Sequence, residues 1–448
     1  MADAEQVQSW INELQSLRWP KKRASDWYSA MPWLVGANFV PSTASNQLEM
    51  WQAETFDEKT IDRELGWAAA IGMNSMRVFL HDLLWKQDAA AFLTRIDRYL
   101  GIASKHGIST MPVFFDSCWH PFPHLGPQRP PERCTHNSCW VQSPGVQVIK
   151  DERSFDELEA YVTGVVSHFR DDRRICLWDV WNEPDNANSM VYGPRDLQER
   201  KSAVVLPLLY KTFKWVRNAK PSQPVSSGVW HQEWNPEQIQ QFHRLQIEAS
   251  DILTFHRYSD QPITQKYVKQ LKAYGRPLIC TEYMSRGSGS TFNAILPYFK
   301  KEGIGAYNWG LVVGKTQTNY PWDSWQKPYE SEPPLWFHEV FQPDGQPYRT
   351  EETELIRKLT RTRRGPDNRK RPSHILSAPL NSIFPDYGYC TPLGSALPAS
   401  LPAGRSTART AVGSGAGHSA VLSGHPRRQP AQGIPTRGGI ACAGGGLA

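Results

Sequence analysis

The sequence contains no long uninterrupted hydrophobic run. No segment approaches the roughly 18 apolar residues of a membrane-spanning helix, and the start of the chain lacks the apolar core typical of a signal peptide. The seven cysteines are scattered rather than regularly spaced. These absences exclude a transmembrane protein and a disulfide-stapled domain. They predict a cytoplasmic protein as the sequence is written, or a secreted or periplasmic one if the true N-terminus differs.

Net charge is also absent from most of the chain. The formal net charge is +6, from 50 basic and 44 acidic residues, but residues 365–448 hold eight basic and two acidic residues, so residues 1–364 are neutral. Those last 84 residues contain 14 glycines, 10 prolines and none of the 18 tryptophans. Such a composition cannot bury enough surface to offset chain entropy, which predicts a disordered tail. A nucleic-acid-binding tail is the weaker alternative, because its arginines lack interleaved aromatic residues.

Three cysteines and two histidines fall in one segment that could suggest a zinc site. They are Cys118, Cys134 and Cys139, with His120 and His136 nearby. Zinc thiolate sites usually contain closer pairs such as Cys-x-x-Cys. We therefore favour free or singly bridged thiols over a metal site, and we expect no cofactor.

Short apolar or β-branched runs alternate with amphipathic stretches from about residue 33 to residue 360, a pattern typical of parallel βαβ units. The predicted strands are Trp33–Val40, Ser75–Leu80, Ser109–Phe115, Ile175–Trp181, Pro224–Val229, Ile252–His256, Leu278–Thr281 and Gly305–Leu311. The predicted helices lie near residues 57–71, 88–106, 154–170, 197–218, 235–246, 264–274, 291–302 and 351–362. Eight such units predict a (β/α)₈ barrel over residues 27–364, with long βα loops and a helical extension over residues 1–26. A doubly wound open sheet is the rival, but no Gly-rich phosphate loop follows an early strand.

Two glutamates follow strands that face each other across the mouth of such a barrel. Glu183 follows the fourth strand and Glu282 the seventh, and barrel enzymes carry their chemistry at these carboxyl ends. Cleavage of a glycosidic bond needs one carboxylic acid to protonate the departing oxygen and one carboxylate to attack or to activate water. The alternative, two ion-paired strand ends, is disfavoured by the polar and aromatic residues at the neighbouring strand ends.

The segments Trp181-Asn182-Glu183-Pro184 and Thr281-Glu282-Tyr283 resemble the retaining glycoside hydrolases of clan A, most closely the family-5-like group of cellulases, mannanases and xylanases. The resemblance covers roughly residues 27–345. It implies that Glu183 is the general acid/base and Glu282 the nucleophile of a double displacement on β-linked, plant-type oligo- or polysaccharides (xylan-, mannan- or glucan-like). It also implies that Asn182 bonds the sugar 2-hydroxyl and that Trp309 forms a platform under the sugar being cleaved.

Further residues are expected to support this chemistry. Glu183 needs burial against apolar neighbours to hold a proton, and Glu282 needs donors, for which Arg77 and Tyr258 are predicted. His256 is expected to orient this network. Other candidate substrate-binding residues at the mouth are Asn38, Asp116, Trp119, His120, His231, Glu233 and Trp234, and further sugar subsites are expected from Trp140, Trp230, Trp322 and Trp325. Among these, Asp116 and His120 are expected to bond a sugar on the non-reducing side.

Two long loops, residues 116–153 and 313–334, are expected to wall the mouth and to favour chain ends or short oligosaccharides. The expected partner is an oligo- or polysaccharide, with no nucleic acid and no membrane. A barrel that binds glycans without cleaving them is the alternative function. A metal-dependent hydrolase is disfavoured, because no cluster of His and Asp ligands is expected at the strand ends.

Overall fold

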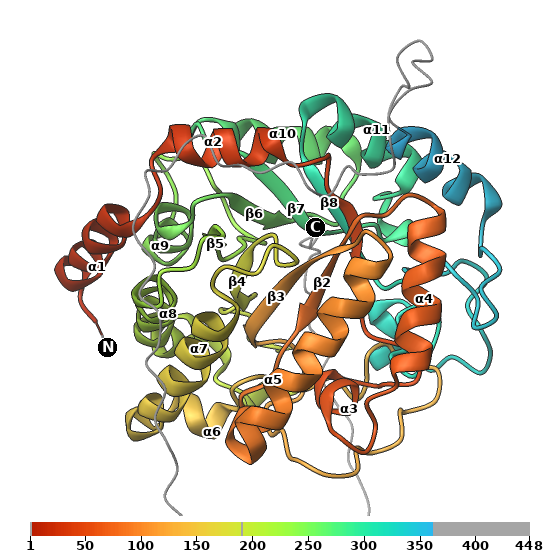
Figure 1. The fold of residues 1–448 in the computed structure, drawn as a ribbon, viewed down its shortest axis with the longest axis horizontal. Helices are drawn as coiled ribbons and strands as arrows, with labels where there is room; N and C mark the ends of the chain where they lie inside the picture. Colours follow the sequence, from red (N-terminus) through yellow and green to blue (C-terminus); the bar gives the residue numbers. More distant parts are fainter. Residues whose placement is uncertain (1, 190, 362–448) are drawn as a thin grey trace, which may run out of the picture. The chain divides into compact units, whose positions relative to one another are not determined.

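A closed barrel of eight parallel strands forms the centre of the molecule (Figure 1). The computed structural model describes residues 2–189 and 191–361, so the tail predicted over residues 365–448 lies outside the described residues. The strand order is β5-β4-β3-β2-β1-β8-β7-β6. An isolated parallel bridge between Val229 and Phe255 joins the two ends of this order. The predicted (β/α)₈ barrel is therefore confirmed, and the open sheet is excluded.

All eight predicted strands are present. They are β1 (Val35–Asn38), β2 (Ser75–Phe79), β3 (Ser109–Asp116), β4 (Trp178–Asn182), β5 (Val225–Ser226), β6 (Leu253–His256), β7 (Leu278–Tyr283) and β8 (Gly305–Trp309). Strand β5 is shorter than predicted, because beyond Ser226 the chain rejoins the sheet only at Val229. Nearly every strand residue is buried, as expected where helices cover the outside and side chains fill the inside of a barrel.

The helices cover the outside of the barrel. They are α1 (Ala4–Leu17), α2 (Lys21–Ala30), α3 (Gln47–Trp51), α4 (Glu58–Ala70), α5 (Asp82–Lys105), α6 (Val146–Ile149), α7 (Phe155–Phe169), α8 (Lys201–Asn218), α9 (Gln241–Ala249), α10 (Gln261–Lys272), α11 (Phe292–Glu302) and α12 (Thr350–Thr360). The helix predicted near residues 235–246 begins only at Gln241, because Asn235 starts a turn whose carbonyl accepts from the Ile239 amide. The helix predicted from residue 88 begins at Asp82 and has non-helical backbone at Asp88.

The two N-terminal helices pack in different places: α1 lies on the outer helices α8 and α9, and α2 lies against the strands. Helix α1 buries Val7, Ile11 and Leu14, which share one face at helical spacing. Helix α2 buries Ala24 in a cluster with Tyr307 and other residues near the amino-terminal ends of the strands. The carboxyl ends of the strands therefore form the face that is left for a site.

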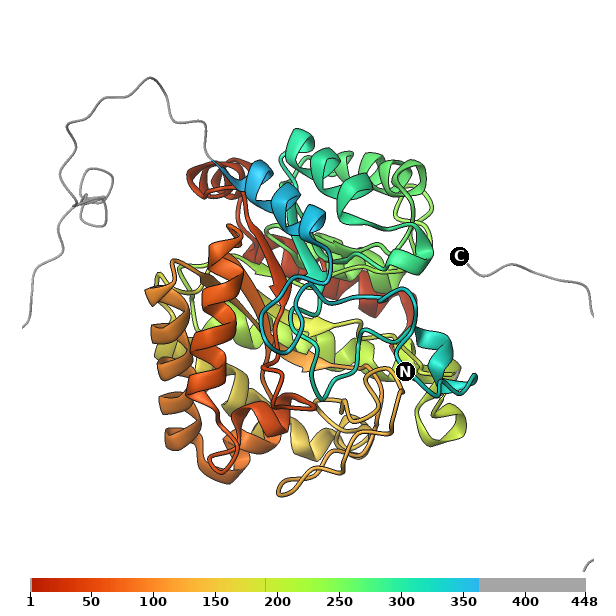
Figure 2. The ribbon, with the colours of Figure 1, turned by 90° about the vertical axis from the view of Figure 1, so that its right-hand side faces the viewer.

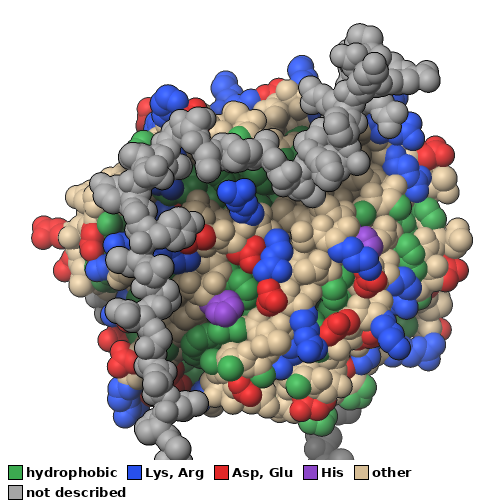
Figure 3. Space-filling model, viewed as in Figure 1, with side chains coloured by type: hydrophobic (Ala, Val, Ile, Leu, Met, Phe, Trp, Pro, Cys, Tyr) green, Lys and Arg blue, Asp and Glu red, His purple; other side chains and the backbone are tan. Residues whose placement is uncertain are grey.

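The surface carries charges of both signs. Figure 3 shows basic and acidic side chains interspersed over one face of the molecule, in keeping with the neutral sum over residues 1–364. Within the described ranges, no helix is both long and apolar enough to cross a membrane.

Candidate active site

Glu183 and Glu282 meet at the barrel mouth. Glu183 directly follows β4 and Glu282 lies in β7, and one oxygen of each lies within 4.8 Å of the other and of His256 Nδ1. Both carboxyl side chains are nearly buried, at 10% and 6% exposure. The backbone of Glu183 has a φ of 41°, in the left-handed region that costs a non-glycine residue free energy. Strain of this kind is typical of functional positions.

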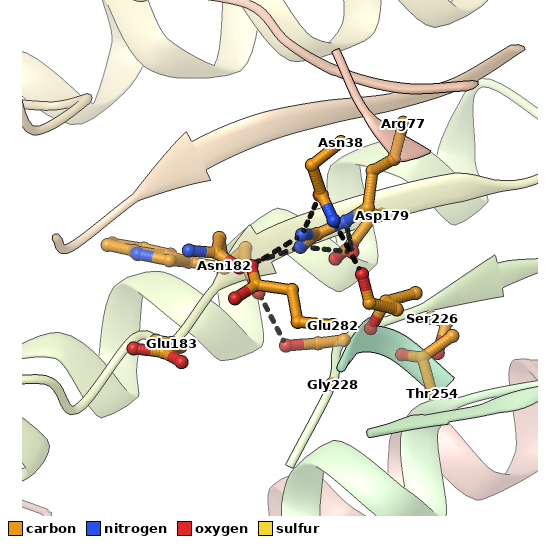
Figure 4. Close-up of polar contacts among 12 residues, drawn as sticks. Asn38, Arg77, Asp179, Asn182, Glu183, Ser226, Gly228, Thr254 and Glu282 are labelled. Carbon is orange, nitrogen blue, oxygen red and sulfur yellow. Dashed lines mark hydrogen bonds and ion pairs between the residues drawn. The ribbon is translucent and has the colours of Figure 1, made fainter. Parts of the chain in front are cut away.

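The Arg77 guanidinium connects the residues around Glu282 (Figure 4). Its NH1 group donates to Glu282 Oε1 at 3.0 Å and to Asn38 Oδ1 at 2.8 Å. Its Nε and NH2 groups contact Asp179 Oδ2 at 3.0 and 2.9 Å, and NH2 also donates to Asn182 Oδ1 at 2.7 Å. Because Arg77 is fully buried, these contacts fix its charge beside the Glu282 carboxylate.

Glu282 and Glu183 differ in the charge around them. The Tyr258 hydroxyl donates to Glu282 Oε2 at 2.7 Å, so Glu282 has one cationic and one neutral donor. Glu183 Oε1 contacts His256 Nδ1 at 2.8 Å, and its Oε2 accepts from Asn186 Nδ2 at 2.7 Å. Within residues 2–189 and 191–361, no lysine or arginine pairs with Glu183.

These surroundings set different protonation preferences. Burial raises the pKa of the Glu183 carboxyl, which favours its protonated form. Burial and the charge of Glu183 also raise the pKa of Glu282, but Arg77 and Tyr258 oppose that shift. Burial lowers the pKa of His256 to about 4, so this imidazole is neutral at neutral pH. Burial therefore favours the protonated form of both carboxyl groups, and Arg77 and Tyr258 favour the ionised form at Glu282 alone.

The amide of Asn182 is fixed in one orientation. Its Oδ1 accepts from Arg77 and its Nδ2 donates to Asp116 Oδ1 at 3.0 Å. An amide nitrogen carries two hydrogens, so the second one stays available toward Cys118 Sγ at 3.4 Å or toward a ligand. This is the orientation that a donor to a sugar hydroxyl needs.

Asp116, which is predicted to bond a sugar, is buried and paired within the protein. Its side chain is only 1% exposed, and its oxygens accept from Trp140 Nε1 at 2.5 Å, from Asn182 and from the Cys118 amide. Asn38 is used in the same way: its Nδ2 donates to the Thr281 and Asn308 carbonyls and its Oδ1 accepts from Arg77. Both residues position their neighbours, and the polar atoms of both are engaged within the protein.

Three other predicted substrate-binding residues have side chains that are buried or paired within the protein. Trp234 is fully buried and packs on Phe255 and Tyr267, so it belongs to the core. Trp140 is also buried; it packs edge-on against Trp309 and lines a small cavity beside that ring. The carboxylate of Glu233 contacts Lys266 and Gln270 of α10. These residues follow strands or lie in mouth loops, but their side chains turn toward packed helices or strands.

A cluster of histidine and aspartate stands beside Glu183, contrary to the prediction. Asp185 Oδ2 contacts His231 Nε2 at 2.7 Å and His243 Nε2 at 2.9 Å, and Asp185 Oδ1 accepts from Trp230 Nε1 at 2.8 Å. Although burial opposes it, contact with the two histidines holds the pKa of Asp185 below its usual value. His231 keeps 31% of its side chain exposed. Spacing could not reveal the cluster, because its members come from two strand ends and from α9.

The two long loops form one joined wall (Figure 2). The Cys134 amide donates to Gln317 Oε1 at 2.8 Å, and the Asn137 amide donates to the Thr316 carbonyl at 2.8 Å. Trp119 stacks on Trp325, with ring centroids 5.4 Å apart. The expectation of two separate walls is thereby refined into a single one, which links the ends of β3 and β8.

Several aromatic and histidine side chains keep partial exposure at the mouth. They are Trp119, His120, Trp230, His231, Tyr258, Trp309, Trp322 and Trp325. Trp309 stands edge-on against Phe79, and a small cavity beside it reaches Asn38, Gly310 and Glu339. His120 accepts from the Phe122 amide and lies edge-on to Tyr192. Flat apolar faces of this kind suit the C–H sides of pyranose rings.

The cysteines of the described chain are free. Cys134 and Cys139 are buried, while Cys118 is half-buried and its thiol contacts Glu183 Oε2 at 3.3 Å. Neither cysteine-containing metal group nor disulfide is found among these residues. Sequence reasoning placed Cys118 with the loop thiols, and it missed Asn186 and Asp179 entirely, because none of them belongs to a recognisable motif.

Comparisons with known proteins give structural neighbours only. No family model matches the chain, and no curated protein matches it. The chain is similar to a β-1,4-mannanase of the common sea hare Aplysia kurodai, with 18% identity, 62% of this chain and 88% of that chain covered, and a TM-score of 0.45. It is similar to an exo-β-1,4-mannosidase of Opitutaceae bacterium strain TAV5, with 19% identity, 73% and 58% covered, and a TM-score of 0.49. A β-mannanase of the blue mussel Mytilus edulis shares 12% identity, with 75% and 93% covered and a TM-score of 0.47.

Proposed function

We propose that this protein is a retaining glycoside hydrolase that cleaves β-linked bonds in oligo- or polysaccharides. The observation that carries the proposal is the pair of buried carboxyl groups at the ends of β4 and β7, whose nearest oxygens lie within 4.8 Å. Retaining enzymes hold their two carboxyl groups about 5–5.5 Å apart, whereas inverting enzymes leave about 6.5–9.5 Å for a water molecule. The short separation supports direct attack by one carboxylate.

Glu282 is the nucleophile in this proposal. Arg77 and Tyr258 favour its ionised form, so it attacks the anomeric carbon while the bond to the leaving oxygen breaks. A covalent glycosyl-enzyme forms with inversion at that carbon. Arg77 then remains paired with buried Asp179, so its charge stays balanced when Glu282 becomes an ester.

Glu183 is the general acid and then the general base. Because its pKa is raised, the Glu183 carboxylic acid holds a proton, which it donates to the departing oxygen in the first step. As a carboxylate, it then takes a proton from the water that attacks the glycosyl-enzyme, and this second inversion restores the original anomer. Asn182, held by Arg77 and Asp116, directs an amide hydrogen to the sugar 2-hydroxyl.

The side chains at the barrel mouth indicate the class of substrate. A neutral body with partly exposed tryptophans favours an uncharged, β-linked sugar chain. We assign the activity to the barrel proposed over residues 27–364. Xylan-, mannan- and glucan-type chains all satisfy these features, and the sugar is assigned by experiment.

The test is hydrolysis of a panel of aryl β-glycosides and of xylo-, manno- and gluco-oligosaccharides, with separation of the products and binding measured in parallel. We expect at least one sugar series to be cleaved. Binding without any product across the panel would favour a carbohydrate-binding barrel and contradict the proposal. Unchanged rates after treatment with a chelator are also expected, since the steps above use only side chains of the chain itself.

A further inference from the structure

The thiol of Cys118 contacts the carboxyl group assigned to acid/base chemistry. Cys118 stands two residues beyond the end of β3, and its Sγ lies 3.3 Å from Glu183 Oε2. Two amide nitrogens also reach this sulfur, Asn182 Nδ2 at 3.4 Å and Asn186 Nδ2 at 3.5 Å. The sulfur therefore touches the proposed acid/base and both asparagines around it.

A hydrogen bond of the Cys118 backbone fixes the position of the thiol. The Cys118 amide donates to Asp116 Oδ1 at 2.9 Å, and Asp116 is itself held by the Trp140 indole and by Asn182. The side-chain N–H groups of Asn182 and Asn186 donate to the sulfur and occupy its two lone pairs. The S–H bond is left to point at Glu183 Oε2, which among the described residues is the one carboxyl oxygen within hydrogen-bond reach of the sulfur.

Cys118 stays a thiol under ordinary conditions. Burial raises the pKa of Cys118, and the neighbouring carboxyl groups of Asp116, Glu183 and Glu282 raise it further. A thiolate beside Glu183 is therefore disfavoured. The neutral thiol is a weak hydrogen-bond donor and also a weak hydrogen-bond acceptor, through the same sulfur atom.

This dual character matches what the proposed reaction asks of Glu183, which is a carboxylic acid in one half-reaction and a carboxylate in the other. The Asn186 amide can only donate, so it supports the carboxylate alone. The thiol can donate to the carboxylate. When Asn182 directs its amide hydrogen to the sugar, one acceptor position of the sulfur is released, and after a rotation about the Cβ–Sγ bond the thiol can accept from the carboxylic acid. We propose that Cys118 is a positioning residue that holds the Glu183 carboxyl group in both of its protonation states; this inference rests on the function proposed above.

The test uses the full chain with serine and alanine at this position. A serine hydroxyl is a stronger donor than a thiol, so Cys118→Ser should stabilise ionised Glu183 and move the alkaline limb of the kcat/KM profile to lower pH. The kcat/KM profile reports the free enzyme, in which the two asparagines donate to the sulfur and the thiol only donates to Glu183. Cys118→Ala therefore removes a donor and should move the same limb to higher pH. A hydrogen bond of ordinary net strength corresponds to a shift of roughly 0.5–1 pH unit. The substrate is an aryl β-glycoside with a poor leaving group, whose departure depends on protonation by Glu183.

The matched control is Cys139→Ala in the same loop, whose thiol contacts the Arg129 carbonyl and not Glu183. Its pH profile should coincide with that of the wild type. If alanine at position 118 lowers the thermal midpoint, Cys118→Val fills the space better and should give the same alkaline shift. Opposite shifts for serine and for alanine or valine support the inference.

Shifts in the same direction, or profiles that superimpose on the wild type, overturn the inference while leaving the proposed function intact. Absence of hydrolysis by the wild type overturns both. The two failures are therefore distinguished by the wild-type protein alone.

Discussion

The hydroxyl of Tyr258 offers the sharpest single perturbation of the proposed nucleophile. It donates to Glu282 Oε2 at 2.7 Å, while Arg77 independently contacts Oε1 at 3.0 Å. A hydrogen bond to a charged group contributes about 1.5–3 kcal/mol, and one pKa unit corresponds to about 1.36 kcal/mol. Tyr258→Phe should therefore raise the pKa of Glu282 by about 1–2 units. Since ionised Glu282 is the attacking form, the acidic limb of the kcat/KM profile should move to higher pH by the same amount.

The assay is initial-rate hydrolysis of an activated aryl β-glycoside across the acidic range. Tyr274→Phe is the matched control, because Tyr274 is also half-buried and its hydroxyl donates to the Trp234 carbonyl, away from either carboxylate. The control should keep the wild-type acidic limb. An acidic limb in Tyr258→Phe that stays in place, or moves to lower pH, would refute the assignment of Glu282 as the ionised group.

Other changes test the remaining parts of the site and the fold. Glu183→Gln should slow substrates with poor leaving groups far more than activated aryl glycosides, compared by kcat/KM for each. Glu282→Ala should abolish turnover, and added azide should partly restore consumption of a reactive aryl glycoside as an azide adduct. Trp309→Ala should raise KM by about 5- to 150-fold through loss of stacking worth roughly 1–3 kcal/mol, as measured with oligosaccharides. Arg286→Met should lower the free energy of unfolding by about 3–5 kcal/mol in urea titrations, because it leaves the Glu352 carboxylate, paired at 2.6 Å, buried alone.

The barrel could be predicted because its signal is repetitive. Eight alternations of an apolar run and an amphipathic stretch leave few other folds, and local errors such as the late start of α9 do not alter the count. The strand ends could also be located, because a polar residue lies at or within two residues of the carboxyl end of each buried strand. Since all parallel strands of a barrel end at the same mouth, Arg77, Asn182, His256, Tyr258 and the two glutamates were expected together, and the structure places them in contact.

What the sequence could not supply is the direction in which each side chain turns. Asp116 ends a strand like its neighbours, but the loop that follows folds back and brings Trp140 over it, which removes it from the mouth. Trp234 follows β5, but its ring turns outward into the core between barrel and helix. The contact between His243 and Asp185 depends on how α9 packs, and no local pattern encodes that packing.

Trapping of the glycosyl-enzyme identifies the nucleophile directly. The protein is incubated with a 2-deoxy-2-fluoro aryl β-glycoside of the sugar that the hydrolysis panel identifies, and the label is located by mass spectrometry of proteolytic peptides. We expect one covalently bound sugar per chain, attached to Glu282 in the peptide that contains β7 (Leu278–Tyr283). Attachment to Glu183, or steady turnover that releases the inverted anomer with no covalent adduct, would contradict the assignment of Glu282 as the nucleophile.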